Sequence, residues 1–313
     1  MFFSKKQDFL KEINLLTGII VNGLYLSFTI RTHRFSKFES ACLNTFLLSE
    51  TWTKGTILTM LEQYIRTSLI VDKEKLAHLW NKRILIFGVG GVGGNALESL
   101  ARIGIGSFDI VDDDTVALSN INRQILATRS TYGQNKVDVA EQRVHDVNPE
   151  IIVNKHQTFY LPDKKEEFDF SKFDYILDCI DTVTAKIDII CEAKRVGVPV
   201  ISAMGCGNRL DPTKLVLCDI YETKGDPLSK IMRHELKKRN ITSLKVVCST
   251  EQPIKPKAIE YESSLVPGKK NVPGSTSFVP PVAGTFIGYQ VAMDLINSED
   301  KEDNIRKNNP FLD

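Results

Sequence analysis

A glycine-rich turn at residues 88–93 constrains the fold of this chain more than any other stretch of it. The turn reads Gly-Val-Gly-Gly-Val-Gly and follows a continuous apolar run, 84–87, which is typical of a strand buried on both faces. A helix-like run at 95–103 comes next, and a short second strand ends at Val111 with Asp112 directly after it. Strand, glycine turn, helix and acid in this order are typical of a βαβ unit that binds a nucleotide or a dinucleotide.

Each part of the turn has a physical reason. Gly88 allows the sharp turn, Gly90 lets backbone approach a phosphate closely, and Gly93 lets the following helix pack tightly on the strand. The helix should begin near Val92, so that its free N–H groups and its dipole point at the anion. Asp112 lies where an acid can accept hydrogen bonds from a ribose. The residues expected to bind the cofactor here are Gly88, Gly90, Gly91, Gly93 and Asp112.

Composition excludes several classes of protein. The 313 residues carry a formal net charge of +1, which argues against a wholly basic nucleic-acid coat but not against a local basic patch. Six cysteines form no CxxC pair, so we expect no structural zinc and infer a reducing cytoplasm. The apolar runs 17–30 and 282–296 are short and interrupted by polar residues, so we expect no membrane span and read 282–296 as a core-packing helix.

The first 59 residues show no clear repeat, cap or motif. Met60 starts a segment that leads into the nucleotide-binding unit, and we hypothesise that it is the biological start and that 1–59 is an upstream extension. A helix is expected over 61–81, with Leu69, Leu76 and Leu79 on its apolar face and Asp72 as a cap for its second half.

Strands and helices alternate through the remainder of the chain, which predicts an α/β fold, Rossmann-like, with a mostly parallel sheet flanked by helices. We expect a core over 60–212, a smaller C-terminal α+β extension of the same domain over 213–297, and a charged, frayed tail over 298–313. The expected strands after the glycine unit are 151–153, 175–179, 198–202, 215–220 and 245–248. The expected helices are 133–147, 183–196, 226–240 and 282–296, the last within the segment 278–296 that closes the domain.

Open α/β sheets bind ligands at the carboxyl ends of their strands, so several polar groups should converge at that edge. They are the loop 120–124 with Asn120, Arg123 and Gln124, then Lys136 at the head of the next helix, and Asp181 after the strand at 175–179. Two cations, Arg123 and Lys136, suit a triphosphate better than the pyrophosphate of NAD. Asp181 is the candidate ligand for Mg²⁺, which proteins usually bind through one or two carboxylates plus phosphate oxygens.

These residues together resemble the ubiquitin-activating (E1-like) superfamily, which includes ThiF and MoeB. The resemblance covers roughly residues 60–296 and comprises the glycine turn, Asp112-x-Asp114, Ser119-Asn120-x-x-Arg123-Gln124, Lys136 and Asp178-x-x-Asp181. Within the superfamily the chain looks most like the tRNA threonylcarbamoyladenosine dehydratase branch. The segments that carry this are 102–106, 205–212, Asp226-Pro227-Leu228, Ser249-Thr250-Glu251 and Phe278-Val279-Pro280.

The resemblance implies an ATP site in which Asp112 holds the ribose, Arg123 and Lys136 hold phosphates, and Asn120 and Asp181 organise the triphosphate and Mg²⁺. It implies a homodimer in which Arg66 reaches into the partner's site, and a cysteine desulfurase or sulfur acceptor as a further partner. The implied activity is ATP-dependent cyclisation, with loss of water, of N6-threonylcarbamoyladenosine at position 37 of certain tRNAs. Arg123, Lys136 and Asp181 would be the catalytic residues, and ATP would turn the substrate's carboxylate into a group that can be displaced.

Two departures from the sulfur-carrier-activating branch matter. The paired CxxC motifs of many of its members are absent, and no cysteine stands out as a thioester nucleophile; Cys248 is given no role. The alternative activity is adenylation of the C-terminus of a ubiquitin-like sulfur carrier. A non-catalytic nucleotide-binding partner protein and an NAD-dependent dehydrogenase are weaker alternatives.

A basic helix is expected to hold the tRNA. Lys230, Arg233, His234 and Lys237 recur at helical spacing within 226–240, so they share one face. A basic face of this kind can contact phosphates without reading sequence. The same pattern also fits an ordinary solvated helix face.

Overall fold

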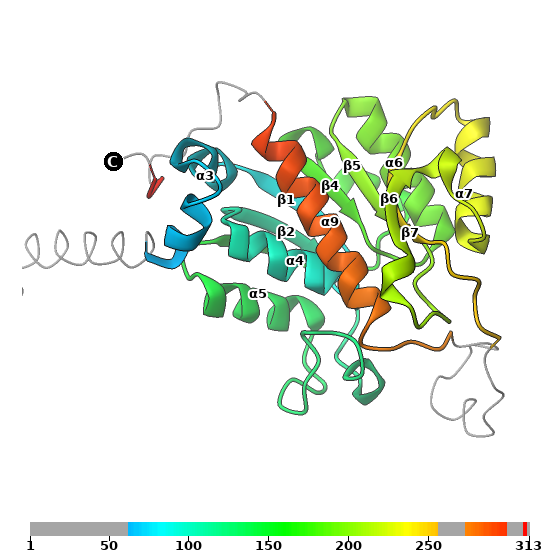
Figure 1. Cartoon of the computed structure of the whole chain (residues 1–313), viewed down its shortest axis with the longest axis horizontal. Helices are drawn as coiled ribbons and strands as arrows, with labels where there is room; N and C mark the ends of the chain where they lie inside the picture. The colour runs from blue at the N-terminus through cyan, green and yellow to red at the C-terminus, as the bar shows by residue number, and fades with distance from the viewer. Residues whose placement is uncertain (1–61, 256–272, 299–308, 312–313) are drawn as a thin grey trace, which may run out of the picture. The chain divides into compact units, whose positions relative to one another are not determined.

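The apolar runs of the sequence form a seven-stranded sheet in a computed structural model that describes residues 62–255, 273–298 and 309–311 (Figure 1). The strands are β1 (Arg83–Phe87), β2 (Ser107–Val111), β3 (Ile152–His156), β4 (Tyr175–Asp178), β5 (Val200–Ala203), β6 (Leu215–Asp219) and β7 (Lys245–Ser249). The described residues all fall within the unit 57–313. The expectation for 1–59 and Met60 lies outside them.

The strand order is β3-β2-β1-β4-β5-β7-β6, with every neighbouring pair parallel except the antiparallel pair β6 and β7. The prediction of a mostly parallel sheet is therefore confirmed. From β1 the chain builds β2 and β3 on one side and then crosses to β4 and β5 on the other. Strand order thus reverses between β1 and β4, and such a switch point is where open α/β sheets bind ligands.

Helices cover both faces of this sheet. The α-helices are α3 (Lys73–Trp80), α4 (Gly93–Ile103), α5 (Lys136–Val147), α6 (Val183–Val196), α7 (Pro227–Lys238) and α9 (Val279–Ile296). Short 3-10 helices are η1 (Leu118–Asn120), η2 (Pro162–Glu167), η3 (Phe170–Lys172), η4 (Pro212–Lys214) and η5 (Ile220–Glu222).

The alternation of side chains along β1 creates two cores. Ile84 and Ile86 belong to a cluster with residues of α3, α4, α5 and α9, whereas Leu85 and Phe87 belong to a second cluster with residues of α6 and α7. Successive strand residues point to opposite faces, so one apolar strand supplies both cores. Figure 1 shows α9 crossing the sheet beside α4, and these two helices pack against each other.

The segment 282–296 is a core-packing helix, as the sequence predicts. α9 buries Ala283, Ile287 and Val291 completely. Among the helices of the described residues, none is both long and apolar enough to cross a membrane.

The predicted helix over 61–81 is wrong as one continuous element. Residues 62–68 are helical, the helix then breaks, and α3 begins only at Lys73. Asp72 occupies the N-cap position of α3, but its side chain makes no capping hydrogen bond. Leu76 and Leu79 of α3 are fully buried, whereas Leu69 lies in the break and is 79% exposed.

Two further boundaries differ from the predictions. The helix expected from Gly133 begins at Lys136, because Gly133 has a left-handed φ of 80° that an α-helix does not allow. In the predicted frayed tail, Phe311 is only 4% exposed. Its ring packs edge to face on those of Tyr64 and Trp80, with distances of 5.3 and 6.3 Å between the ring centroids.

Candidate nucleotide site

The glycine turn connects β1 to α4 at the point where strand order reverses. Gly88 has a left-handed φ of 84°, and a Cβ there would lie 2.9 Å from the Cys179 carbonyl oxygen. A Cβ on Gly93 would lie 1.8 Å from the Gly88 carbonyl oxygen, so only glycine lets α4 pack this closely. By contrast, the nearest atom to a Cβ on Gly90 is Nε2 of Gln124 at 3.6 Å, an ordinary contact.

The backbone N–H groups of this turn are arranged for an anion. α4 begins at Gly93 with Val92 as its N-cap, as predicted. Within the described residues, the N–H groups of Gly90, Gly91 and Val92 donate no hydrogen bond. Unpaired N–H groups at a helix N-terminus, together with the helix dipole, favour a phosphate group.

Asp112 directly follows β2 and lies beside the turn. Its carboxylate accepts hydrogen bonds from the N–H of Val89 at 2.9 Å and from the N–H of Asp114 at 3.0 Å. Burial raises the pKa of Asp112, and the charge of Lys136 opposes this rise. Fixed hydrogen bonds to the backbone therefore orient this acid toward the glycine turn, where a ribose could lie.

Lys136 begins α5 and is only 5% exposed, so it heads the helix and points inward as predicted. Its ammonium group lies 2.6 Å from a carboxylate oxygen of Asp114 and 3.7 Å from one of Asp112. The prediction gave Lys136 to the triphosphate alone. The structure shows Lys136 paired with two aspartates, of which Asp114 had no predicted role.

The loop after β2 brings Arg123 and Gln124 to the turn, where they lie beside Gly91 and Gly90. The Arg123 guanidinium donates to the Ser119 carbonyl at 3.0 Å and to the Asn122 side chain at 2.9 Å. Burial lowers the pKa of Arg123, and the charge of the nearby Asp181 raises it. Asp181 is therefore near enough for its charge to act on Arg123, although the two side chains form no ion pair.

Asn120 and Gln124 have different surroundings. The Asn120 side chain accepts a hydrogen bond from the N–H of Ala117, so it caps its own loop. Gln124 is 7% exposed, and within the described residues its Oε1 atom is buried without a hydrogen-bond partner. A buried amide oxygen without a partner is costly, so a bound ligand is one way to satisfy it.

Asp181 lies just past the end of β4 and is exposed. The acidic groups whose oxygens lie within 4.8 Å of one another are instead Asp112, Asp113 and Asp114. Lys136 already pairs with two of these three, so this cluster is not a better cation site. A single exposed carboxylate such as Asp181 fits a Mg²⁺ ion whose other ligands would be phosphate oxygens and water.

Arg66 does not reach the site of its own chain. It is exposed on the helical segment 62–68, where Tyr64 packs on Gly104 at the C-terminal end of α4. The glycine turn lies at the other end of this 11-residue helix, about 16 Å away. Whether Arg66 serves a partner's site stays a prediction.

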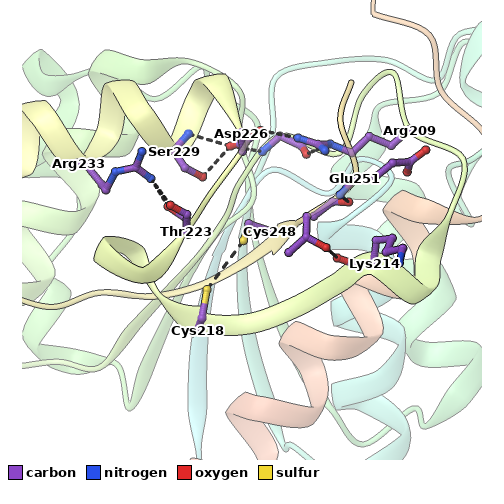
Figure 2. A network of polar contacts seen from close by, with 12 residues as sticks. Arg209, Lys214, Cys218, Thr223, Asp226, Ser229, Arg233, Cys248 and Glu251 are labelled. Carbon is purple, nitrogen blue, oxygen red and sulfur yellow. Dashed lines mark hydrogen bonds and ion pairs between the residues drawn. The ribbon is translucent and has the colours of Figure 1, made fainter. Parts of the chain in front are cut away.

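The basic helix α7 forms as predicted, but its four cations are not equivalent. Lys230, His234 and Lys237 are exposed. Arg233 is half-buried and donates to the Thr223 carbonyl at 2.9 Å and to the Thr223 hydroxyl (Figure 2). Arg233 therefore holds α7 to the preceding loop, which leaves it less free for an external phosphate.

The first turn of α7 is fixed by a buried ion pair. Asp226 caps the helix by accepting from the N–H and hydroxyl of Ser229 at 2.7 and 2.6 Å. The Arg209 guanidinium donates to Asp226 at 2.8 Å and to the Gly205 carbonyl at 3.0 Å (Figure 2). This network ties α7 to the loop that follows β5.

Cys248 is fully buried, and its sulfur lies 3.8 Å from that of Cys218 (Figure 2). Burial raises the pKa of Cys248 to about 12, so the thiolate that a nucleophile needs is scarce at neutral pH. This agrees with the expectation that Cys248 has no catalytic role. A cavity of about 490 Å³ lies near the amino ends of β4, β5 and β7, where the Tyr175 hydroxyl and the Lys245 ammonium each donate to the carboxylate of Asp294.

Comparison with known proteins identifies the family. The sequence profile of the ThiF family matches residues 62–293. A Bacillus subtilis protein named tRNA threonylcarbamoyladenosine dehydratase is 40% identical over 243 residues, which are 76% of this chain and 96% of that protein. A Haemophilus influenzae protein of the same name is 32% identical over 235 residues, 72% of this chain and 90% of that protein.

Solved structures that resemble this chain come from a protein of the same kind as its sequence relatives. The crystal structure of E. coli tRNA N6-threonylcarbamoyladenosine dehydratase in complex with ATP superposes with a TM-score of 0.65 at 29% identity, covering 75% of this chain and 93% of that one. The AMP complex of the same E. coli protein superposes with a TM-score of 0.66, covering 75% and 94%. Profile, relatives and fold agree: the chain belongs to the ThiF family.

Proposed function

We propose that this chain is an ATP-dependent tRNA threonylcarbamoyladenosine dehydratase. The observation that carries the proposal is the match to 96% of the length of a relative that bears this name. The geometry supports it, because unpaired N–H groups of the glycine turn, Asp112, Arg123 and Asp181 meet at the switch point of the sheet. An E. coli relative has been solved with ATP bound.

The chemistry explains why a dehydratase would need ATP. A carboxylate is a poor acyl donor because its leaving group would be oxide. Reaction with ATP converts it to a mixed anhydride, either with phosphate and release of ADP or with AMP and release of pyrophosphate. The carbamoyl group of the same nucleoside then attacks the carbonyl carbon and loses a proton, the bond from that carbon to the bridging anhydride oxygen breaks, and a five-membered ring closes. The carboxylate oxygen leaves on phosphate or AMP, so no free water is expelled in the step.

The residues of the site would position and neutralise charge. The attack is intramolecular, so its effective molarity is already high and no covalent cysteine intermediate is needed. Asp112 would accept hydrogen bonds from the ribose hydroxyls, and the N–H groups of the glycine turn would hold phosphate oxygens. The guanidinium of Arg123 and the ammonium of Lys136 would stabilise the charge that develops on the phosphates.

Magnesium fits this arrangement through Asp181. When bound, the ion would neutralise phosphate oxygens and make the phosphorus more electrophilic. The charge of Asp181 acts on Arg123, and both would act on the same phosphates.

The exposed basic residues Lys230, His234 and Lys237 of α7 would contact tRNA phosphates. A homodimer in which Arg66 completes the partner's site, a sulfur-transferring partner and a location in the cytoplasm are parts of the proposal that rest on family resemblance. Cys179, Cys191, Cys206, Cys218 and Cys248 are free thiols, which agrees with a reducing compartment.

Nucleoside mass spectrometry tests this function. The purified protein is incubated with tRNA that carries threonylcarbamoyladenosine, with and without ATP, and the tRNA is digested to nucleosides. The expected result is a nucleoside lighter by one water, formed only with ATP. An unchanged nucleoside together with ATP–pyrophosphate exchange that needs a small carrier protein would favour the sulfur-carrier alternative.

A further inference from the structure

A fully buried ion pair lies directly beneath the loop that carries Asp181. Asp178 ends β4, Lys186 lies in the first half of α6, and both side chains are 0% exposed. The Lys186 ammonium lies 3.0 Å from Oδ2 of Asp178. Removing two charges from water is expensive, and apolar residues of similar volume would often serve stability as well. Stability alone is therefore a weak reason for this pair.

The same ammonium holds the turn that follows β4. Lys186 Nζ donates to the carbonyl oxygen of Ile180 at 3.0 Å, while the Ser202 hydroxyl donates to Oδ2 of Asp178 at 2.5 Å. One cation thus bonds to the last residue of β4 and to the residue immediately before Asp181. The turn at 178–181 is fixed at both of these points.

This turn also packs against the glycine turn. A Cβ on Gly88 would lie 2.9 Å from both the Cys179 carbonyl oxygen and the Cγ2 atom of Ile180. The N–H of Cys179 donates to the Phe87 carbonyl at 2.9 Å. Any shift of Ile180 would therefore alter its packing against Gly88 and would move Asp181 relative to the proposed phosphate site.

We infer that Lys186 is a positioning residue, which fixes the carbonyl of Ile180 so that Asp181 faces the magnesium–triphosphate. The inference rests on the proposed function, because it takes Asp181 as the residue that meets the metal. It assigns Lys186 a task that no apolar replacement could perform, since only a donor can hold the Ile180 carbonyl.

A double variant separates positioning from stability. Lys186→Met leaves the Asp178 carboxylate buried and unpaired, so it should unfold more easily; Lys186→Met with Asp178→Asn removes both charges and should recover most of the melting temperature. The measurement is the affinity for ATP by titration calorimetry, with and without Mg²⁺. Should the double variant not fold, Lys186→Met with Asp178→Leu replaces it.

The structure offers a matched control and a reference. Arg209 and Asp226 form another buried ion pair, with side chains 1% and 2% exposed, but they hold α7 and not Asp181 (Figure 2). The control variant is Arg209→Met with Asp226→Asn. The reference is Asp181→Asn, which removes the carboxylate itself.

The expected result is that Mg²⁺ strengthens ATP binding in the wild type and in the control. In Lys186→Met with Asp178→Asn the ratio of ATP affinity with Mg²⁺ to that without it should fall about tenfold, as it should in Asp181→Asn. A folded double variant with the wild-type gain, alongside a reduced gain in Asp181→Asn, would overturn only the role of Lys186. An unchanged gain in Asp181→Asn would overturn the proposed role of Asp181, and that of Lys186 with it.

Discussion

At the scale of single residues, the glycines of the turn divide into two kinds. Gly88 and Gly93 are required by the fold itself, through a left-handed φ and a backbone contact that excludes any Cβ. Gly90 has no left-handed φ, and a Cβ on it would make only an ordinary contact within the protein. We therefore propose that the glycine there serves the approach of a phosphate, as the spacing of the motif predicts.

Alanine substitutions test this division. Gly90→Ala should fold with a melting temperature close to that of the wild type, because its Cβ meets only an ordinary contact, yet it should weaken ATP binding at least about tenfold. Gly93→Ala should lose about 3 kcal/mol or more of stability, because α4 must move away from Gly88. Thermal unfolding and titration calorimetry measure the two effects. A Gly90→Ala variant that binds ATP normally would contradict the phosphate-binding role.

The sequence predicts where site residues lie better than what they bond to. The motif spacing placed Asp112, Lys136 and Asp181 correctly at the carboxyl ends of strands or the head of a helix. It could not show that Lys136 pairs with Asp114, because such pairs depend on side-chain reach across loops. Lys186 could have been recognised as a buried charge from the sequence, because it lies on the apolar face of its helix with Ile189, Ile190 and Ala193.

At the scale of elements, Glu98 joins α4 to α5. Its carboxylate accepts from the Arg143 guanidinium at 2.8 Å through both oxygens, and from Arg102 one turn along its own helix at 2.7 Å. Burial raises the pKa of Glu98, but the hydrogen bonds and charges of Arg143 and Arg102 outweigh it and lower the pKa below its ordinary value. The group that holds these helices together therefore needs its negative charge.

Glu98→Gln should lower the free energy of unfolding by about 1 kcal/mol near neutral pH, because both arginines are partly exposed and screened by water. The folded-state pKa is lowered, so the stabilisation is complete above about pH 5 and is lost as the pH falls through the folded-state pKa. Urea unfolding of both proteins between neutral and acid pH measures the difference. Glu235→Gln, whose partners lie on its own helix, is the control and should change less. A difference independent of pH would contradict the charge-dependent link.

The structure sharpens the prediction for the basic helix. Lys230→Glu with Lys237→Glu should weaken tRNA binding about tenfold and flatten its salt dependence, because two exposed phosphate contacts are lost. Arg233 is left intact because it holds α7 to Thr223. Exposed lysines on α3 and α6 supply the control, Lys75→Glu with Lys194→Glu. Filter binding at several salt concentrations is the measurement, and an unchanged affinity and slope would remove α7 from the interface.

At the scale of the whole molecule, the order of strands separates the proposed tasks. The groups proposed to bind the nucleotide follow β1, β2 and β4, which are interior strands, whereas α7 follows β6, which is an edge strand. Apolar runs and glycines predicted the parallel part, since those signals are local. They could not show that β6 pairs antiparallel at the edge, or that Phe311 packs on Tyr64, because both depend on contacts between segments distant in sequence.

Arg66 offers a test of assembly, because it lies far from the site of its own chain. In a homodimer where Arg66 acts on the partner's site, Arg66→Ala and Arg123→Ala should each be nearly inactive alone. After the two are mixed and allowed to exchange subunits, half of the dimers should contain both, and each of these has one intact site, so about a quarter of the wild-type activity should return. Mixtures as inactive as either variant, despite proven exchange, would contradict the role of Arg66 in the partner's site.

The central claim is that ATP turns the carboxylate of the tRNA nucleoside into a group that can be displaced. Its most direct test uses tRNA whose threonylcarbamoyl carboxylate carries a heavy oxygen isotope, incubated with the protein and unlabelled ATP. Mass spectrometry of the products should find the heavy oxygen in phosphate or AMP, in proportion to the cyclised nucleoside, and the labelled product would identify which of the two activates the acid. Heavy oxygen found in water, with cyclised nucleoside formed, would contradict the account.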